Sequence, residues 1–295
     1  MKEIIIISGK GGVGKSSITA SLGALLNRKF GLLMADTDVD TPNLALFFAV
    51  KLIESKRITA SEKAVINYKK CISCFTCQQT CKFSAITGEE SPVIISFSCE
   101  GCGACTLTCP EDAIAIQSLP NGMLYTYKTE DLFIISGELD IGESSSGHIV
   151  DVVKKGAREK AESLHSEIIL IDGPPGIGCP VISSIKGGDY VLAVTEPTPA
   201  ALNDLKRLYE VLLYFKLPFG IVINKSDIHL KSKQTIKDFA KDKEIPILSE
   251  IPYDTCIPMA IAKAMPVVTA YPDAQASLTI RSLADKLTDI IKLID

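Results

Sequence analysis

Eight of the ten cysteines in the chain lie between Cys71 and Cys109, in two copies of a C-x2-C-x2-C-x3-C pattern. The second copy begins 28 residues after the first, at Cys99. Each copy is followed at the same offset by an Ala-Ile pair, at 85–86 and 113–114. An internal repeat of this kind predicts a small module built from two similar halves.

The spacing of these cysteines predicts two [4Fe-4S] clusters. Three thiolates separated by two residues can surround one face of a cluster, whereas the fourth reaches across to the other cluster. The expected ligands of the first cluster are therefore Cys71, Cys74, Cys77 and Cys109, and those of the second are Cys99, Cys102, Cys105 and Cys81. Pro110 follows the last cysteine of the second copy, as in bacterial ferredoxins, whereas the first copy has Lys82 there.

Zinc and disulfides are the alternatives for such a cysteine-rich stretch. Structural zinc sites favour two C-x2-C pairs separated by a wider gap. Disulfides are expected in exported chains, and the short apolar run 4–7 before a Gly-rich loop does not resemble a signal peptide. We therefore expect a cytoplasmic chain with reduced thiols. A net charge of −4 and the lack of an 18-residue apolar run predict neither nucleic-acid nor membrane partners.

A phosphate-binding loop is expected near the N-terminus. Residues Gly9 to Ser16 match G-x-x-x-x-G-K-[ST], after the strand-like run 4–7 and before the helical pattern 16–28. The glycines let backbone N–H groups face phosphate oxygens, Lys15 reaches the β- and γ-phosphates, and the Ser16 hydroxyl binds Mg²⁺. A Gly-rich turn without nucleotide is the alternative. The expected nucleotide contacts in the loop are Gly11, Gly12, Val13, Gly14, Lys15, Ser16 and Ser17.

Apolar runs and helical patterns alternate along the rest of the chain. Strands are expected at 4–7, 32–35, 132–135, 168–171, 190–194 and 219–223, and helices at 204–215, 232–243 and 275–294. This alternation predicts an α/β fold with a doubly wound, mostly parallel sheet. The stretch 58–118 does not fit it, so we expect a P-loop domain of residues 1–57 and 119–295 with a small α+β ferredoxin-like insert at 58–118.

The P-loop contains an additional lysine, in the sequence Lys10-Gly-Gly-Val-Gly-Lys15-Ser16. The chain here resembles the deviant Walker A ATPases, which include the Mrp, MinD and ParA proteins and the nitrogenase iron protein. In that family the additional lysine crosses a dimer interface to the nucleotide of the partner. The resemblance implies that Lys10 has this catalytic role and that ATP joins two subunits into a homodimer.

Further segments resemble the switch regions and the base-binding segments of this family. The resemblance implies that Asp38 orients the attacking water, with Asp36 in support, and that Asp172 holds Mg²⁺ through water. Asn224 would contact the adenine, and Pro252 would close over the base. Taken singly, each segment can also be a solvated strand end or a turn. The C-terminal Cys-Pro-x-Cys motif of the Mrp cluster carriers is absent, and Cys256 stands alone.

The remaining candidate residues are expected to be structural. Cys179 follows Asp172 at the place of a cluster-ligating cysteine in the nitrogenase iron protein, but no second cysteine accompanies it, so we expect a buried thiol. Cys256 is expected to be structural too. His148, His165 and His229 have no ligand spacing. The lysine pair 154–155 is expected at a solvated helix end.

Three functions follow from these expectations. The first is an ATPase that couples nucleotide-driven dimer closure to electron transfer toward a partner protein. The second is an iron–sulfur carrier or scaffold of the Mrp type, which would pass its clusters to an acceptor. The third is a MinD-like regulatory ATPase whose clusters stabilise the fold or sense redox state. A closed set of eight cysteines favours the first function over the second.

Overall fold

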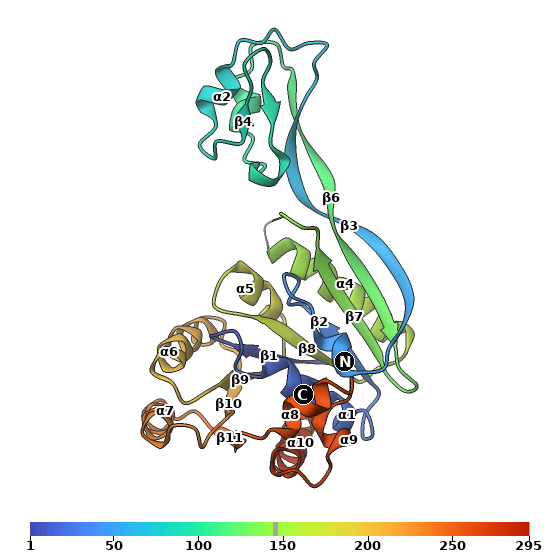
Figure 1. The fold of residues 1–295 in the computed structure, drawn as a ribbon, viewed down its shortest axis with the longest axis vertical. Helices are drawn as coiled ribbons and strands as arrows, with labels where there is room; N and C mark the ends of the chain where they lie inside the picture. Colours follow the sequence, from blue (N-terminus) through green and yellow to red (C-terminus); the bar gives the residue numbers. More distant parts are fainter. Residues whose placement is uncertain (144–146, 295) are drawn as a thin grey trace.

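The computed structural model describes residues 1–143 and 147–294. Its body is a nine-stranded sheet in the order β11-β10-β9-β1-β8-β2-β7-β6-β3, with helices on both faces (Figure 1). Neighbouring strands are parallel from β11 to β7, whereas β6 runs antiparallel to both β7 and β3. The expected α/β class with a mostly parallel sheet is confirmed.

The strands of this sheet are β1 (Lys2–Ser8), β2 (Leu32–Asp36), β3 (Lys51–Ile66), β6 (Ile114–Lys128), β7 (Phe133–Leu139), β8 (Ile168–Pro175), β9 (Tyr190–Thr195), β10 (Phe219–Ile223) and β11 (Ile247–Glu250). The helices that cover it are α1 (Lys15–Leu26), α4 (Gly147–Ser163), α5 (Cys179–Ile185), α6 (Pro199–Tyr214), α7 (Leu230–Asp242), α8 (Cys256–Ile261), α9 (Val267–Ala270) and α10 (Gln275–Leu293).

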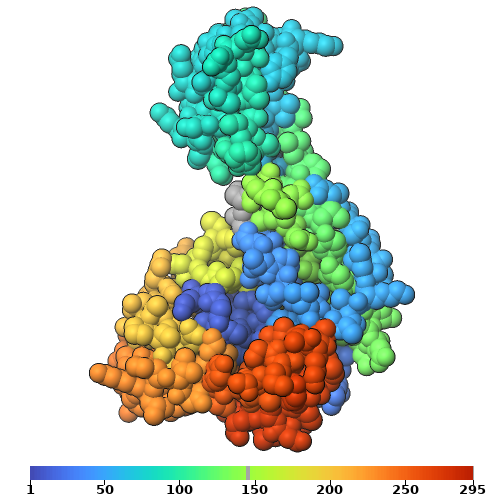
Figure 2. All heavy atoms as spheres, viewed as in Figure 1, coloured from blue at the N-terminus to red at the C-terminus, as the bar shows by residue number. Residues whose placement is uncertain are grey.

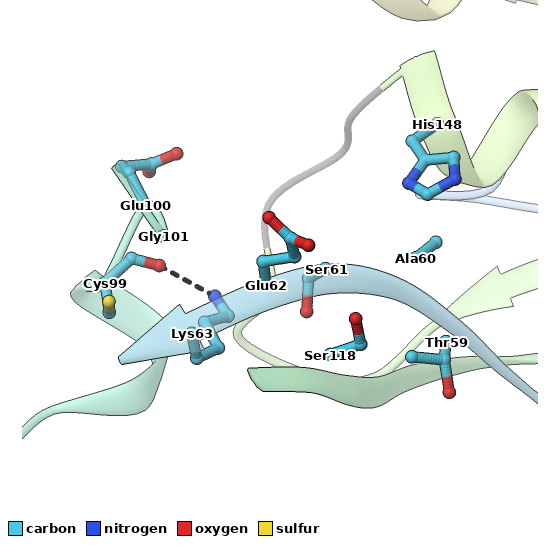
Figure 3. Close-up of a pocket in the computed structure, with 10 residues that line it drawn as sticks. All are labelled: Thr59, Ala60, Ser61, Glu62, Lys63, Cys99, Glu100, Gly101, Ser118 and His148. Atoms are coloured by element: carbon cyan, nitrogen blue, oxygen red, sulfur yellow. Dashed lines mark hydrogen bonds between the residues drawn. The ribbon is translucent and has the colours of Figure 1, made fainter. Parts of the chain in front are cut away.

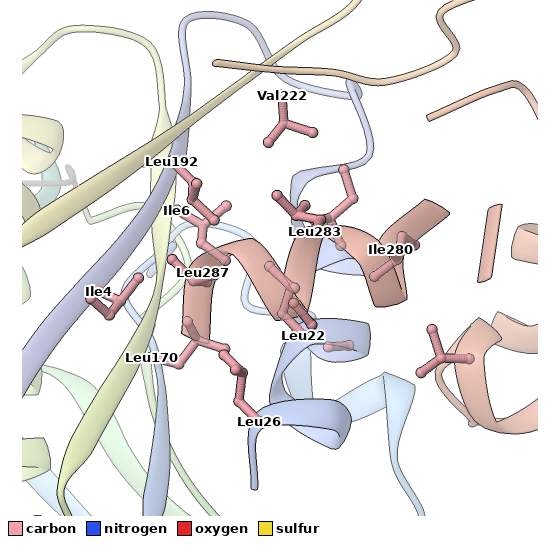
Figure 4. Close-up of a cluster of buried hydrophobic side chains, with 14 of the residues drawn as sticks. Ile4, Ile6, Leu22, Leu26, Leu170, Leu192, Val222, Ile280, Leu283 and Leu287 are labelled. Carbon is pink, nitrogen blue, oxygen red and sulfur yellow. The ribbon is translucent and has the colours of Figure 1, made fainter. Parts of the chain in front are cut away.

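Residues 4–7 of strand β1 are all isoleucine because both faces of the sheet are covered there. Its side chains alternate between two cores. Ile4 and Ile6 pack with Leu22 of α1 and Leu283 of α10 on one face (Figure 4). The alternate side chains of β1 face a second core, which α4, α5, α6 and α7 complete. Burial on both faces is typical of a central strand in a parallel sheet.

All six strands expected from the apolar runs are present, and so are the expected helices. Helix α6 begins at Pro199, earlier than its apolar pattern indicated, because the Thr198 hydroxyl accepts a hydrogen bond from the Ala201 N–H and caps the helix. The short strand β11 was not predicted, and α4 extends to both sides of residues 154–155, where only a helix end was expected. Within 1–143 and 147–294, no helix has the length and apolar character needed to cross a membrane.

A small lobe stands away from the sheet at the end of the paired strands β3 and β6 (Figures 1 and 2). It contains helices α2 (Thr76–Thr80) and α3 (Ala104–Leu107), the short strands β4 (Ile86–Thr87) and β5 (Val93–Ile94), and an apolar cluster of its own. Residues 58 and 118, where we expected the insert to begin and end, lie inside these long strands. The antiparallel pair therefore continues from the sheet into the lobe.

The lobe repeats its backbone conformation at the spacing of the cysteines. Left-handed backbone occurs at Ser73, Phe75 and Ser84, and again 28 residues later at Gly101, Gly103 and Asp112. Helices α2 and α3 each begin directly after one of these positions. Left-handed conformations are costly for residues other than glycine, so their recurrence shows that both halves follow the same path.

Candidate functional site

The Gly-rich loop lies between β1 and α1, at the carboxyl edge of the sheet. Gly12 and Gly14 have left-handed backbone, with φ of 78° and 89°. A Cβ on Gly14 would lie 2.3 Å from Asn224 Nδ2, so the loop needs glycine there for space as well as for conformation. The loop leads into the N-terminus of α1, where unpaired N–H groups favour an anion.

Lys15 and Ser16 meet Asp172 at the end of β8. Lys15 Nζ lies 2.8 Å from Asp172 Oδ2, and the Ser16 hydroxyl donates to the same oxygen at 2.6 Å. The Thr19 hydroxyl donates to Asp172 Oδ1 at 2.7 Å, a contact that the sequence did not predict. Asp172 is fully buried. The three residues expected at a Mg²⁺–phosphate centre therefore lie together, with Thr19 orienting the carboxylate.

Asp36 and Asp38 follow β2, the strand beside β8. The Asp36 carboxylate accepts hydrogen bonds from the N–H groups of Asp38, Asn43 and Leu44, so it organises the backbone of this segment. Burial, reinforced by the nearby charge of Asp172, raises the pKa of Asp36 to about 7. Burial also raises the pKa of Asp38, although the charge of Lys15 opposes that shift. Backbone N–H groups bind the Asp36 carboxylate, whereas the Asp38 carboxylate accepts a hydrogen bond from the Thr41 hydroxyl.

Lys10 is held by its own subunit. Its Nζ lies 3.0 Å from Glu196 Oε1, and Lys225 Nζ lies 2.9 Å from Glu196 Oε2. Burial acts to raise the pKa of Glu196, but the hydrogen bonds and charges of these two lysines lower it overall. Lys225 Nζ also donates to the Gly12 carbonyl at 3.1 Å, so the pair of lysines ties the loop to the end of β9. Glu196 was not predicted, although its place directly after a parallel strand is typical of site residues.

The segments expected around the base adjoin the loop. Asn224 Nδ2 donates to the Val13 carbonyl at 2.7 Å, and its Oδ1 is buried without a hydrogen-bond partner in the part of the chain that the structure describes. Pro252 is half-buried just after β11. The Tyr253 N–H beside it donates to Asp227 Oδ1 at 2.7 Å, which joins the two segments.

The eight cysteines of the small lobe line two separate cavities. The first contains Cys71, Cys74, Cys77 and Cys109, and the second contains Cys81, Cys99, Cys102 and Cys105. Their empty volumes, about 330 Å³ and 340 Å³ with open solvent included, are nearly equal. Each cavity thus combines three cysteines of one copy with the last cysteine of the other.

Backbone N–H groups point at several of these sulfurs. Ala85 N–H donates to Cys81 Sγ at 3.4 Å, and Ala113 N–H donates to Cys109 Sγ at 3.3 Å, in equivalent positions of the two copies. A third such bond, at 3.4 Å, joins Ala64 N–H to Cys99 Sγ. Such donors stabilise thiolates that ligate a metal cluster.

The structure shows the state of the cysteines directly. All ten cysteines are free of disulfides. Across residues 1–143 and 147–294, no three His, Cys, Asp or Glu side chains form a group arranged to hold a single metal ion. Four thiols line each of the two cavities.

Two expectations about other residues are wrong. The Cys179 thiol is exposed, because this residue is the first of α5 and follows an exposed loop. Lys154 is not at a solvated helix end: it lies inside α4, is 3 % exposed and pairs with Glu3 at 3.2 Å. Burial lowers its pKa, whereas the ion pair opposes this effect. Cys256 packs partly against the core, as expected.

The three histidines lie at the surface, as expected. His229 caps α7 by accepting a hydrogen bond from the Ser232 N–H.

Several known proteins are similar to this chain over nearly its whole length. An uncharacterized protein of Methanocaldococcus jannaschii, MJ0578, is 39% identical over 290 residues, covering 98% of this chain and 97% of the relative. An iron–sulfur cluster carrier protein of Aquifex aeolicus is 24% identical, covering 99% of this chain and 69% of the carrier. The septum site-determining protein MinD of Pyrococcus horikoshii, solved with Mg-ADP, superposes with a TM-score of 0.59 at 20% identity, covering 100% and 98% of the two chains.

A family profile covers most of the chain. Residues 4–267 match the CobQ/CobB/MinD/ParA nucleotide binding domain, a span that runs from β1 to the start of α9 and includes the small lobe. Together with the arrangement of the P-loop, Asp172 and the parallel sheet, this match shows that the chain belongs to the CobQ/CobB/MinD/ParA family of nucleotide-binding domains.

Proposed function

We propose that this protein is a Mg²⁺-dependent ATPase that carries two [4Fe-4S] clusters and couples ATP-driven closure of a homodimer to electron transfer toward a partner protein. The observation that carries the proposal is the crossed sorting of eight cysteines into two cavities, on a lobe that shares its two long strands with the sheet of the nucleotide site. Sequence spacing alone predicts this sorting for paired clusters.

The nucleotide site supports ATP hydrolysis. Lys15 and the loop N–H groups would bind the phosphates, and Ser16 and Asp172 would hold Mg²⁺ directly and through water. Asp38 would orient the water that attacks the γ-phosphorus, giving ADP and inorganic phosphate. The unpaired Asn224 Oδ1 would accept a hydrogen bond from the adenine amino group, with Pro252 beside the base.

Lys10 supports the dimer. Its side chain is 42 % exposed, and Glu196 keeps Lys225 as a partner, so Lys10 can leave without stranding a buried charge. In a closed dimer, Lys10 would reach the phosphates bound by the partner subunit and neutralise charge that develops during hydrolysis. This exchange of partners would make closure depend on ATP.

The cysteine cavities fit the proposed clusters. Each offers four thiols, the number that a [4Fe-4S] cluster requires, and backbone donors to sulfur. When bound, such clusters exchange single electrons. A low-potential one-electron donor protein would supply the electrons, and an acceptor protein docked on the lobe would receive them.

Anaerobic purification tests the proposal. We expect about eight irons and eight sulfides per chain, EPR signals of reduced clusters, and Mg²⁺-dependent ATPase activity. ATP, but not ADP, should change the rate at which the reduced protein passes electrons to an acceptor. Zinc or no metal at all would overturn the cluster half of the proposal, and equal rates with ATP and ADP would overturn the coupling.

A cluster carrier is the second candidate, because a relative over nearly the whole chain bears that name. Cys74 and Cys102, one in each cavity, are exposed, so an acceptor could reach one thiol of each set. This function predicts that iron moves to an apo acceptor protein. Retention of all iron during incubation with the acceptor would exclude it. For a MinD-like regulatory ATPase, a pull-down would instead recover partners that lack redox centres.

A further inference from the structure

A short segment, Leu139 to Glu143, contacts both the nucleotide site and the small lobe. Its first residue donates a backbone hydrogen bond to the Val39 carbonyl at 3.0 Å, directly beside Asp38. Asp140 N–H donates to the Asn121 carbonyl at 3.0 Å, and the Asp140 carboxylate pairs with Arg57 of β3. The segment is thus fastened to the loop after β2 on one side and to the long strand pair on the other.

Lys63 connects this segment to the second cysteine cavity. The lysine is only 4 % exposed, at the pocket where the lobe meets the body (Figure 3). Its Nζ donates to the Cys99 carbonyl at 3.0 Å and lies 3.1 Å from Glu143 Oε2. The next residue, Ala64, donates its N–H to Cys99 Sγ. A buried cation therefore holds a cysteine of one cavity and a carboxylate of the Leu139–Glu143 segment together.

The two cysteine cavities differ in their contact with a buried lysine. Cys71, the equivalent of Cys99 in the first copy, has no lysine contact of this kind within residues 1–143 and 147–294. The first cavity is lined by a carboxylate instead, that of Glu111. The two halves of the lobe have the same backbone path. Among the described residues, the charged connection to the nucleotide-binding body is that of the second cavity.

We propose that Lys63 and Glu143 form the coupling link through which the nucleotide state sets the reduction potential of the cluster held by Cys81, Cys99, Cys102 and Cys105. This inference rests on the proposed clusters. Lys63 is a positioning residue: it acts on the cluster through its charge and through the Cys99 peptide, and it binds no substrate.

The chemistry of the link follows from charge. Reduction adds a negative charge to a cluster, so an unbalanced cation nearby favours the reduced form. Glu143 balances Lys63 in this structure, and its Oε2 accepts no directional hydrogen bond within the described residues, so the pair depends on proximity alone. When ATP reorders the loop containing Asp38 and Val39, Leu139 and the segment behind it would shift. Glu143 would then withdraw and the potential would rise.

The test is an EPR-monitored redox titration of the protein with both clusters, in ADP–Mg²⁺ and in a non-hydrolysable ATP analogue. In the wild type, the analogue should raise one of two midpoint potentials and leave the other unchanged. Lys63→Gln should lower that same midpoint, because it removes the cation. Glu143→Gln should raise it in both nucleotides and remove the response to the analogue.

Matched controls separate this link from a general effect of charge. Lys70→Gln removes an exposed lysine beside Cys71, and Glu62→Gln removes an exposed carboxylate from the same pocket as Lys63. Both variants should keep the response of the wild type. A response of wild-type size in Glu143→Gln, or unchanged midpoints in Lys63→Gln, would overturn the inference.

A second measurement does not need the clusters. In the metal-free protein, the ATP analogue should change hydrogen exchange in residues 60–66 of the wild type but not of Glu143→Gln. An equal change in both proteins contradicts the link. Absence of clusters from the purified protein contradicts the proposed function instead, so the two failures are distinguishable.

Discussion

Lys10 and Glu196 form an ion pair within one subunit, with Nζ and Oε1 3.0 Å apart, although the family resemblance assigns Lys10 to the nucleotide of a partner. The lysine cannot serve both groups at once. In the proposed dimer, closure would therefore break a contact within the single subunit. Lys225 would still pair with Glu196 at 2.9 Å after Lys10 left, which limits the cost.

Replacing Lys10 by Gln should separate nucleotide binding from dimerisation. ATP affinity should stay within a few-fold of the wild type, because Lys15 remains in place. ATP-dependent dimers should be lost, and hydrolysis should fall on the order of 100-fold, since one cation is removed from the developing charge. Light scattering after gel filtration, with an ATP analogue, measures the dimer.

Lys225→Gln is the matched control, because it removes the other partner of Glu196. It should leave dimerisation intact. Dimers of Lys10→Gln in the presence of the analogue would contradict the assigned role.

Thr19 should matter for stability because it satisfies a fully buried carboxylate. Thr19→Val keeps the shape of the side chain but leaves Asp172 Oδ1 without its 2.7 Å hydrogen bond. Loss of a partner at a buried acceptor costs about 1–3 kcal/mol. Urea denaturation of the metal-free protein should show that loss. Thr41→Val, at an exposed hydroxyl 3.4 Å from Asp38, should change stability by no more than about 0.5 kcal/mol.

Asp36 should make the stability of the metal-free protein fall as pH rises. Its pKa is about 7 in the fold and about 3.9 when unfolded, so the folded state binds the additional proton between these values. The stabilisation is complete below pH 4 and is lost as pH rises through 7. A single group contributes at most about 4 kcal/mol over this range.

Urea midpoints measured from pH 4 to pH 8 without Mg²⁺ or nucleotide test this dependence. In Asp36→Asn the decline should be smaller but not absent, because the pKa of Asp38 is raised as well. Asp140 is a control whose effect on stability has the opposite sign. Its hydrogen bonds to Arg57 lower its pKa, so its contribution to stability rises with pH. A flat profile in the wild type is the result that contradicts the assignment.

The sequence predicted the features that depend on local chemistry. The P-loop and the central strands follow from spacing over short distances, whereas the meeting of Ser16 with Asp172 was expected from the family resemblance. Burial on both faces explains why β1 was recognised, since residues 4–7 form an unbroken isoleucine run. The P-loop and strand patterns do not depend on how distant segments pack.

The features that sequence analysis missed depend on packing between distant segments. Lys154 looked like a solvated residue because its partner, Glu3, is 151 positions away, and only the contact of α4 with β1 brings them together. The strand pair β3 and β6 was hidden because the edge strand β3 is exposed over its first seven residues and so has no apolar run. The pair of Lys63 and Glu143 was missed because these residues are far apart in the sequence and meet only in the fold.

The crossed assignment of the cysteines can be tested by pairing substitutions. Cys81 and Cys99 line one cavity, so the double variant Cys81→Ser, Cys99→Ser should lose one cluster and keep about four irons. Cys71 and Cys81 belong to one sequence copy but to different cavities. The variant Cys71→Ser, Cys81→Ser should therefore lose both clusters, because each cavity loses a ligand.

If each copy instead held its own cluster, the results would be reversed. Iron and sulfide counts on anaerobically purified variants distinguish the two arrangements, with Cys256→Ser, outside the lobe, as the control that keeps about eight irons.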